Sequence, residues 1–118
     1  MANPFKVVDK VTLNVDWLLD KLAGNPTQLT LFGLDGTTGG LSDTPLATIA
    51  SHFRRLPVNI FGGQVWEFRI AEDTLDPAHF ERVIAVEYGG QLYSVPDKYA
   101  PEGANRYWRL RTRPTEVA

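Results

Sequence analysis

Three arginines and a tyrosine near the C-terminal end are the residues best suited to binding chemistry. They are Tyr107, Arg109, Arg111 and Arg113. Side chains alternate across a strand, so a strand over residues 106–113 places these four on one face and Trp108 with Leu110 on the other. An arginine ridge beside an aromatic ring could follow a phosphate backbone and stack a base, which indicates single-stranded nucleic-acid binding.

The same strand has two other interpretations. It could be an edge strand, whose exposed charges prevent edge-to-edge aggregation while Trp108 packs in the core. Alternatively, its arginines could pair with carboxylates of the same molecule or of a neighbouring subunit. The candidate carboxylates are Glu72, Asp73, Glu81 and Glu87. Acidic residues gather over 71–97 and basic residues over 98–118, so the two segments could lie close together and neutralise each other.

A second candidate surface comes from a repeated phrase, an aromatic residue followed by Gly-Gly-Gln. It occurs once within residues 55–68 and once within residues 82–95, each time between alternating apolar residues. A Gly-Gly pair in this setting predicts a two-residue hairpin turn, because such turns need positive φ at their centre. The repeat therefore predicts two similar hairpins that face one core and expose their tips. The tip residues expected to bind a partner are Phe61, Gln64, Tyr88 and Gln91.

Groupings typical of catalysis are weak. Ser51 and His52 are adjacent on a predicted helix, so we expect their side chains to diverge. His79 follows Asp76 at a spacing that favours a capping arrangement, although carboxylates around His79 could still form a pocket. The chain has no cysteine, no paired-histidine metal motif and no calcium-loop motif, so we expect neither a metal nor a cofactor. These features predict a protein that is not an enzyme.

A glycine-rich loop over residues 36–40 precedes a predicted helix and invites a phosphate-binding interpretation. It lacks the Gly-Lys-Ser/Thr sequence, and Asp43 at the helix entrance would repel an anion. A flexible connector, able to become ordered on a partner, is the preferred interpretation.

Composition is that of an ordinary folded domain, and we expect residues 1–118 to form a single domain. Apolar residues make up 43% and charged residues 22% of the 118-residue chain, and the formal net charge is −2. This balance supplies no overall attraction to nucleic acid or acidic membranes. No apolar run is long enough to span a membrane and no secretory signal is evident, so we expect a cytoplasmic protein without a membrane partner.

The elements that must position these residues follow from periodicity and turn signals. We expect strands over 6–15, 28–34 and 106–113, helices over 17–23, 45–55 and 77–82, hairpins over 55–70 and 82–95, and a loop over 97–105. Hairpins dominate this order, and the helix over 77–82 is a single turn. The predicted class is therefore α+β, a mainly antiparallel sheet of hairpins with two short helices packed on one face.

The predicted function is a non-enzymatic interaction protein that binds another protein or assembles with itself. The hairpin tips and the arginine-rich last strand would form its binding surface, since aromatics and arginine dominate binding hot spots. A single-stranded nucleic-acid binder is the alternative. The small, cysteine-free chain also suggests a phage or mobile-element protein.

Overall fold

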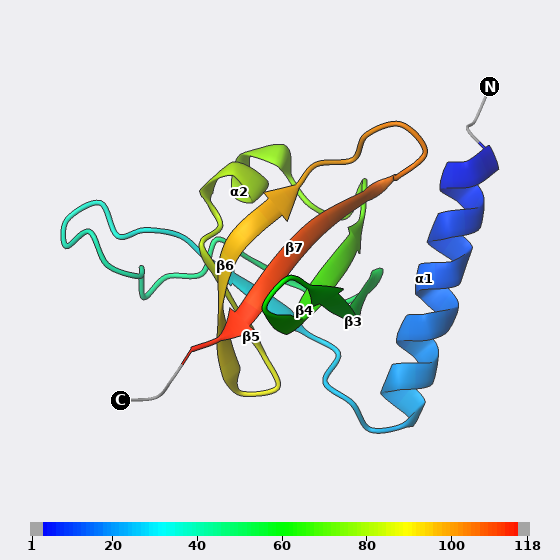
Figure 1. The fold of residues 1–118 in the computed structure, drawn as a ribbon, viewed down its shortest axis with the longest axis horizontal. Coiled ribbons are helices and arrows are strands. Elements are labelled where there is room, and N and C mark those ends of the chain that lie inside the picture. The colour runs from blue at the N-terminus through cyan, green and yellow to red at the C-terminus, as the bar shows by residue number, and fades with distance from the viewer. Residues whose placement is uncertain (1–3, 116–118) are drawn as a thin grey trace.

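The fold is a seven-stranded, curled antiparallel sheet with two helices (Figure 1). The computed structural model describes residues 4–115, and their side chains from residue 13 onwards. The helices are α1 (Pro4–Leu22) and α2 (Pro77–Arg82). The strands are β1 (Leu29–Phe32), β2 (Ala47–Ile49), β3 (Phe53–Ile60), β4 (Gly63–Ala71), β5 (Ala85–Tyr88), β6 (Gln91–Tyr99) and β7 (Tyr107–Pro114). Every pairing is antiparallel, and the strand order is β2-β1-β5-β6-β7-β4-β3. The α+β class and the mainly antiparallel sheet are confirmed.

The two helices differ from the predicted pair of short helices packed on one face of the sheet. α1 has 19 residues and packs on β3 and β4. α2 lies away from α1, beside β6 (Figure 1). There the Lys98 ammonium donates to the carbonyl oxygens of Phe80 and Glu81, each at 2.7 Å.

The N-terminal strand predicted over residues 6–15 is wrong, because α1 is one continuous helix from Pro4 to Leu22. Val11, Leu13 and Val15 alternate as in a strand, but Val11, Val15, Leu18 and Leu22 also recur at helical spacing. The helical pattern extends further along the chain, and the segment forms a helix. The start predicted at Asp16 for a helix over 17–23 therefore falls inside α1.

The helix predicted over residues 45–55 is also wrong. The segment forms β2, a sharp turn and the start of β3, and His52 at the turn has a φ of +60°. Pairing of β2 with β1 and of β3 with β4 supplies the backbone hydrogen bonds that a helix would have made. Ser42, just before this segment, accepts a hydrogen bond from the Thr44 amide within the loop.

Two C-terminal predictions need smaller changes. The one-turn helix forms as expected over Pro77–Arg82, and the Asp76 carboxylate accepts from the Ala78 amide at 2.9 Å. The strand expected to end at Pro96 instead continues to Tyr99, because an irregularity in its pairing between Ser94 and Asp97 accommodates the proline. The predicted loop over 97–105 is correspondingly shorter.

The two hairpins differ in register by one residue, although they carry the same phrase. In the β5–β6 hairpin Tyr88 pairs with Gln91, so both central residues are glycines, with φ of +62° and +79°. In the β3–β4 hairpin Ile60 pairs with Gly63, so Phe61 and Gly62 occupy the turn. The repeated aromatic is therefore a turn residue in one hairpin and a strand residue in the other.

The core lies within the curl of the sheet and is rich in aromatic side chains. Phe68 is fully buried at its centre, with the rings of Tyr88 and Tyr93 at 5.3 and 5.9 Å in edge-on contact. Trp66 and Val95 are partly buried against the same cluster. The prediction that both hairpins face one core is thus confirmed.

Candidate functional site

The arginine-rich strand has the predicted faces but not the predicted place in the sheet. Trp108 and Leu110 are buried, whereas Arg109 and Arg111 are partly exposed and Arg113 is exposed. β7 lies between β6 and β4, so the interpretation as an edge strand is wrong. The edge strands are β2 and β3. The arginines of β7 therefore face residues from two neighbouring strands.

Antiparallel register aligns a row of residues across four strands on this face. Arg54 of β3 pairs with Arg69 of β4, Arg69 with Arg109 of β7, and Arg109 with Tyr99 of β6. Like charges placed opposite each other are unfavourable, so this row needs compensation from neighbouring groups. Asp16 of α1 supplies part of it, since its carboxylate lies 2.6 Å from the Arg54 guanidinium.

The main compensation comes from the carboxylate of Glu67 on β4. Glu67 is completely buried. One carboxylate oxygen accepts from Arg69 Nε at 2.7 Å, and the other accepts from Arg111 Nε at 3.0 Å. Burial alone would raise the pKa of Glu67, but these two hydrogen bonds, together with the attraction of the Arg69 and Arg109 charges, hold the pKa below its ordinary value. The hydrogen bond between Arg111 and Glu67 also raises the pKa of Arg111.

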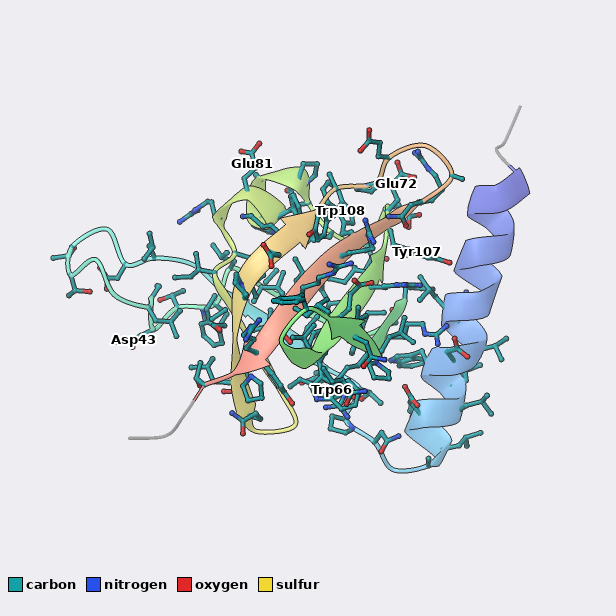
Figure 2. The ribbon with its side chains drawn as sticks, viewed as in Figure 1. Asp43, Trp66, Glu72, Glu81, Tyr107 and Trp108 are labelled. Atoms are coloured by element: carbon teal, nitrogen blue, oxygen red, sulfur yellow. The ribbon has the colours of Figure 1, made fainter. Side chains whose placement is uncertain are left out.

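The expected ion pairing of this segment occurs, in part with a predicted carboxylate and in part with another one. Arg111 pairs with Glu67, which was not among the four candidate carboxylates. Glu72 pairs with Arg106 at 2.5 Å, at the start of the last strand. Tyr107 and Trp108 lie beside Glu72 in Figure 2, and the Trp108 indole donates to the Glu72 carbonyl at 2.8 Å.

Arg109 is the arginine of β7 with a different environment. Its guanidinium lies over the Tyr99 ring, 4.8 Å from the centroid, and Arg111 lies 5.0 Å from the same centroid. Its Nε is buried and has no hydrogen-bond partner in the described part of the chain. Arg109 also borders a cleft of about 440 Å³ between the end of β6 and the loop that leads to β7.

The two hairpin tips are not equivalent. Phe61 is fully exposed at the β3–β4 turn, and Gln64 follows it on the exposed start of β4. Tyr88, expected at an exposed tip, is buried, and its hydroxyl donates to the Pro26 carbonyl at 3.1 Å. Gln91 donates to the carbonyl oxygens of Leu92 and Thr115. The one-residue shift in register explains the difference, because it carries Tyr88 into the sheet.

Sequence reasoning missed the role of Arg55, which lies on the inner side of β3. Its guanidinium is 3.9 Å from the Trp66 ring centroid and 4.9 Å from that of Tyr88, and it donates to the Tyr93 hydroxyl at 3.3 Å. The three aromatic residues come from both copies of the repeated phrase. The equivalent placement of Trp66 and Tyr93 in the two copies was a signal that could have indicated a shared partner.

The two histidines also depart in part from expectation. Ser51 and His52 do contact each other, since Ser51 Oγ lies 3.0 Å from His52 Nδ1. The prediction that they diverge is wrong because the helix on which it relied is a turn. His79 borders a pocket with Arg82 and the β1–β2 loop. Within residues 4–115 no cluster of three potential metal ligands is found.

The β1–β2 loop, residues 33–46, projects from the body of the molecule (Figure 1), and Asp43 lies on it (Figure 2). The helix expected after Gly36–Gly40 is absent, so the loop presents no helix N-terminus to a phosphate. Asp35 orders its tip by accepting from the Thr37 amide at 2.7 Å. The backbones of Leu34 and Leu41 form an isolated antiparallel β-bridge at its base, and both side chains are exposed.

The largest group of exposed apolar side chains on one described element lies on α1. Val15, Leu18, Leu19 and Leu22 are between 49% and 83% exposed. Their spacing of three and four residues places them on one helix face. Leu13 is buried and Trp17 packs against the core, so the opposite face of α1 holds the helix to the sheet.

Comparison with protein-family models, with curated proteins and with solved structures gave no match. None of the helices in the part of the chain that the structure describes combines the length and apolar character needed to cross a membrane. Inferences about function therefore rest on the surfaces described above.

Proposed function

We propose that this protein is a non-enzymatic interaction protein that binds another protein or a second copy of itself. The observation that carries the proposal is the exposed apolar stripe of α1, formed by Val15, Leu18, Leu19 and Leu22. Apolar stripes at this spacing are how amphipathic helices dock into grooves or onto one another. Partial burial of four such side chains would contribute on the order of 5 kcal/mol to association.

The β3–β4 tip is a second contact point within the same proposal. Phe61 is fully exposed at the turn, so its aromatic ring is not buried by the fold of its own chain. Exposed aromatics of this kind act as anchors that fill a pocket on a partner. Gln64 beside it supplies an amide that can donate and accept hydrogen bonds.

The proposal is tested by the double variant Leu18→Gln with Leu22→Gln, whose mass is compared with that of the wild type by light scattering over a range of concentrations. We expect the wild type to associate with rising concentration and the variant to remain monomeric. The matched control is Leu34→Gln with Leu41→Gln, which removes two exposed leucines from the β1–β2 loop.

If the wild type is a monomer throughout, a photocrosslinker at position 18 tests for a different protein partner in the source cells. Failure to form any specific adduct, compared with a crosslinker at position 34, would overturn the proposal.

Single-stranded nucleic-acid binding remains the second candidate, and the aligned row of Arg54, Arg69, Arg109 and Tyr99 favours it. It ranks second because Asp16 and Glu67 already pair with Arg54, Arg69 and Arg111. A fluorescence titration with short DNA and RNA oligomers at low salt tests it. Binding that is insensitive to salt and to Arg109→Ala with Arg111→Ala would exclude this function.

A further inference from the structure

The cleft beside Arg109 is a site that sequence reasoning did not anticipate. Its walls are the end of β6, residues 100–102 and Asn105 of the next loop, and Arg109 of β7, and its volume is about 440 Å³. None of these residues belongs to α1, so the cleft is separate from the surface of the proposed function.

Arg109 is fixed in place without a carboxylate partner among the described residues. The Tyr99 ring supports its guanidinium from one side, and its cross-strand neighbour Arg69 is already bound to Glu67. Its buried Nε lacks an acceptor. A buried donor left without an acceptor is unfavourable, so a further acceptor at this guanidinium would be favoured. A guanidinium fork also matches the two oxygens of a carboxylate.

The other groups of the cleft set the charge of the ligand. Lys98 adds a positive charge but no free donor, because its ammonium donates to the carbonyl oxygens of Phe80, Glu81 and Val83. Glu102 is the acidic residue of the cleft wall. Two cations and one carboxylate leave one net positive charge, which matches a monoanion and disfavours a phosphate dianion.

Asn105 provides a second donor. Its side-chain oxygen accepts from the Tyr107 amide at 3.4 Å, so the oxygen faces the backbone and the side-chain amide group remains as a donor. Arg109 and Asn105 both border the cleft and lie four residues apart in the chain, Asn105 at the end of the β6–β7 loop and Arg109 within β7.

From these contacts we propose that the cleft binds a single carboxylate, held by the Arg109 guanidinium over Tyr99 and by the Asn105 amide. Two sources share this chemistry: a free monocarboxylate and an acidic side chain of a partner protein. Carboxylate binding in the cleft does not involve α1. Failure of the self-association experiment and failure of carboxylate binding would therefore be distinguishable.

The test is an NMR titration of the ¹⁵N-labelled protein, followed at the backbone amides of Tyr99 and Asn105 and at the Arg109 Nε–H. The probes are sodium acetate, a capped Gly-Glu-Gly tripeptide and inorganic phosphate, each against sodium chloride at equal ionic strength. We expect saturable shifts with both carboxylates, with dissociation constants in the millimolar range. Tighter binding of the tripeptide than of acetate would assign the site to an acidic side chain of a partner protein. Equal affinities for the two would assign it to free monocarboxylates.

Arg109→Lys keeps the charge but removes the fork, and we expect it to weaken carboxylate binding at least about tenfold. Arg113→Lys, at an exposed position on the same strand, is the matched control and leaves binding unchanged. Glu102→Gln is expected to raise the affinity for phosphate relative to acetate. Shifts no larger than those with chloride, tighter binding of phosphate than of acetate by the wild type, or equal effects of the two lysine variants would overturn the proposal.

Discussion

Glu67 on β4 and Arg111 on β7 lie opposite each other in the sheet, and Arg111 Nε donates to Glu67 Oε2 at 3.0 Å. The other oxygen of the same carboxylate accepts from Arg69, two residues further along β4. One buried carboxylate thus holds two arginines of a face that is otherwise crowded with positive charge. The pair links two interior strands of the sheet and makes the aligned arginine row tolerable.

The first prediction concerns Glu67→Gln. The amide keeps the size of the side chain but lacks the charge, and its nitrogen cannot accept from an arginine. Breaking a buried pair from one side leaves the arginines without compensation, so we expect a loss of about 2–4 kcal/mol in the free energy of unfolding. Urea denaturation measures the loss. Glu87→Gln, on an exposed position of β5, is the control and should change stability little; a similar loss in both variants would contradict the role assigned to Glu67.

The second prediction is a pH dependence from the same carboxylate. The pKa of Glu67 is lower in the folded protein than in the unfolded chain, so the unfolded state takes up its proton first as the pH falls. The stability that Glu67 supplies is therefore complete above the ordinary glutamate pKa of about 4.3, and it is lost as the pH falls through the lower folded value. We expect the difference in unfolding free energy between wild type and Glu67→Gln to be constant near neutral pH and to shrink in acid. A difference that stays constant down to acid unfolding would refute this assignment.

The third prediction concerns the β5–β6 turn. Gly89 and Gly90 both have positive φ, and a Cβ at Gly89 would also lie 2.9 Å from Pro26 Cγ. Gly90→Ala should cost about 1 kcal/mol from the left-handed backbone alone, and Gly89→Ala should cost more because of the added clash. Gly36→Ala is the control, since Gly36 has open space and no positive φ. Thermal unfolding ranks the three variants, and equal losses at positions 36 and 89 would argue against this turn geometry.

Local signals predicted several elements well. Asp76 followed by Pro77 predicts α2, and the alternation around Trp108 and Leu110 predicts β7 with its two faces. These predictions succeed because a capping side chain and strict alternation act within a few residues, so distant contacts need not be known.

The failures occur where two periodicities compete. Val11, Leu13 and Val15 fit a strand, but the longer helical spacing through Leu22 prevails in α1. Leu46, Ile49 and Phe53 fit a helix, yet pairing with β1 and β4 makes Ile49 and Phe53 strand residues and leaves Leu46 just before β2. In such segments the choice depends on partners that are far away in sequence, which outweigh local propensity.

The candidate sites divide in the same way. The chain by itself determined which residue types are available: an arginine ridge with a tyrosine, two aromatic-Gly-Gly-Gln hairpins, and neither cysteine nor a metal-binding motif. Only the tertiary structure decided which of them are exposed. Strand order placed β7 inside the sheet and Glu67 beside its arginines, and a one-residue difference in turn register exposed Phe61 while burying Tyr88. Burial and cross-strand contact are properties of register, which is set by the turn within each hairpin and, for β7 against β4, by pairing between strands that lie far apart in the chain.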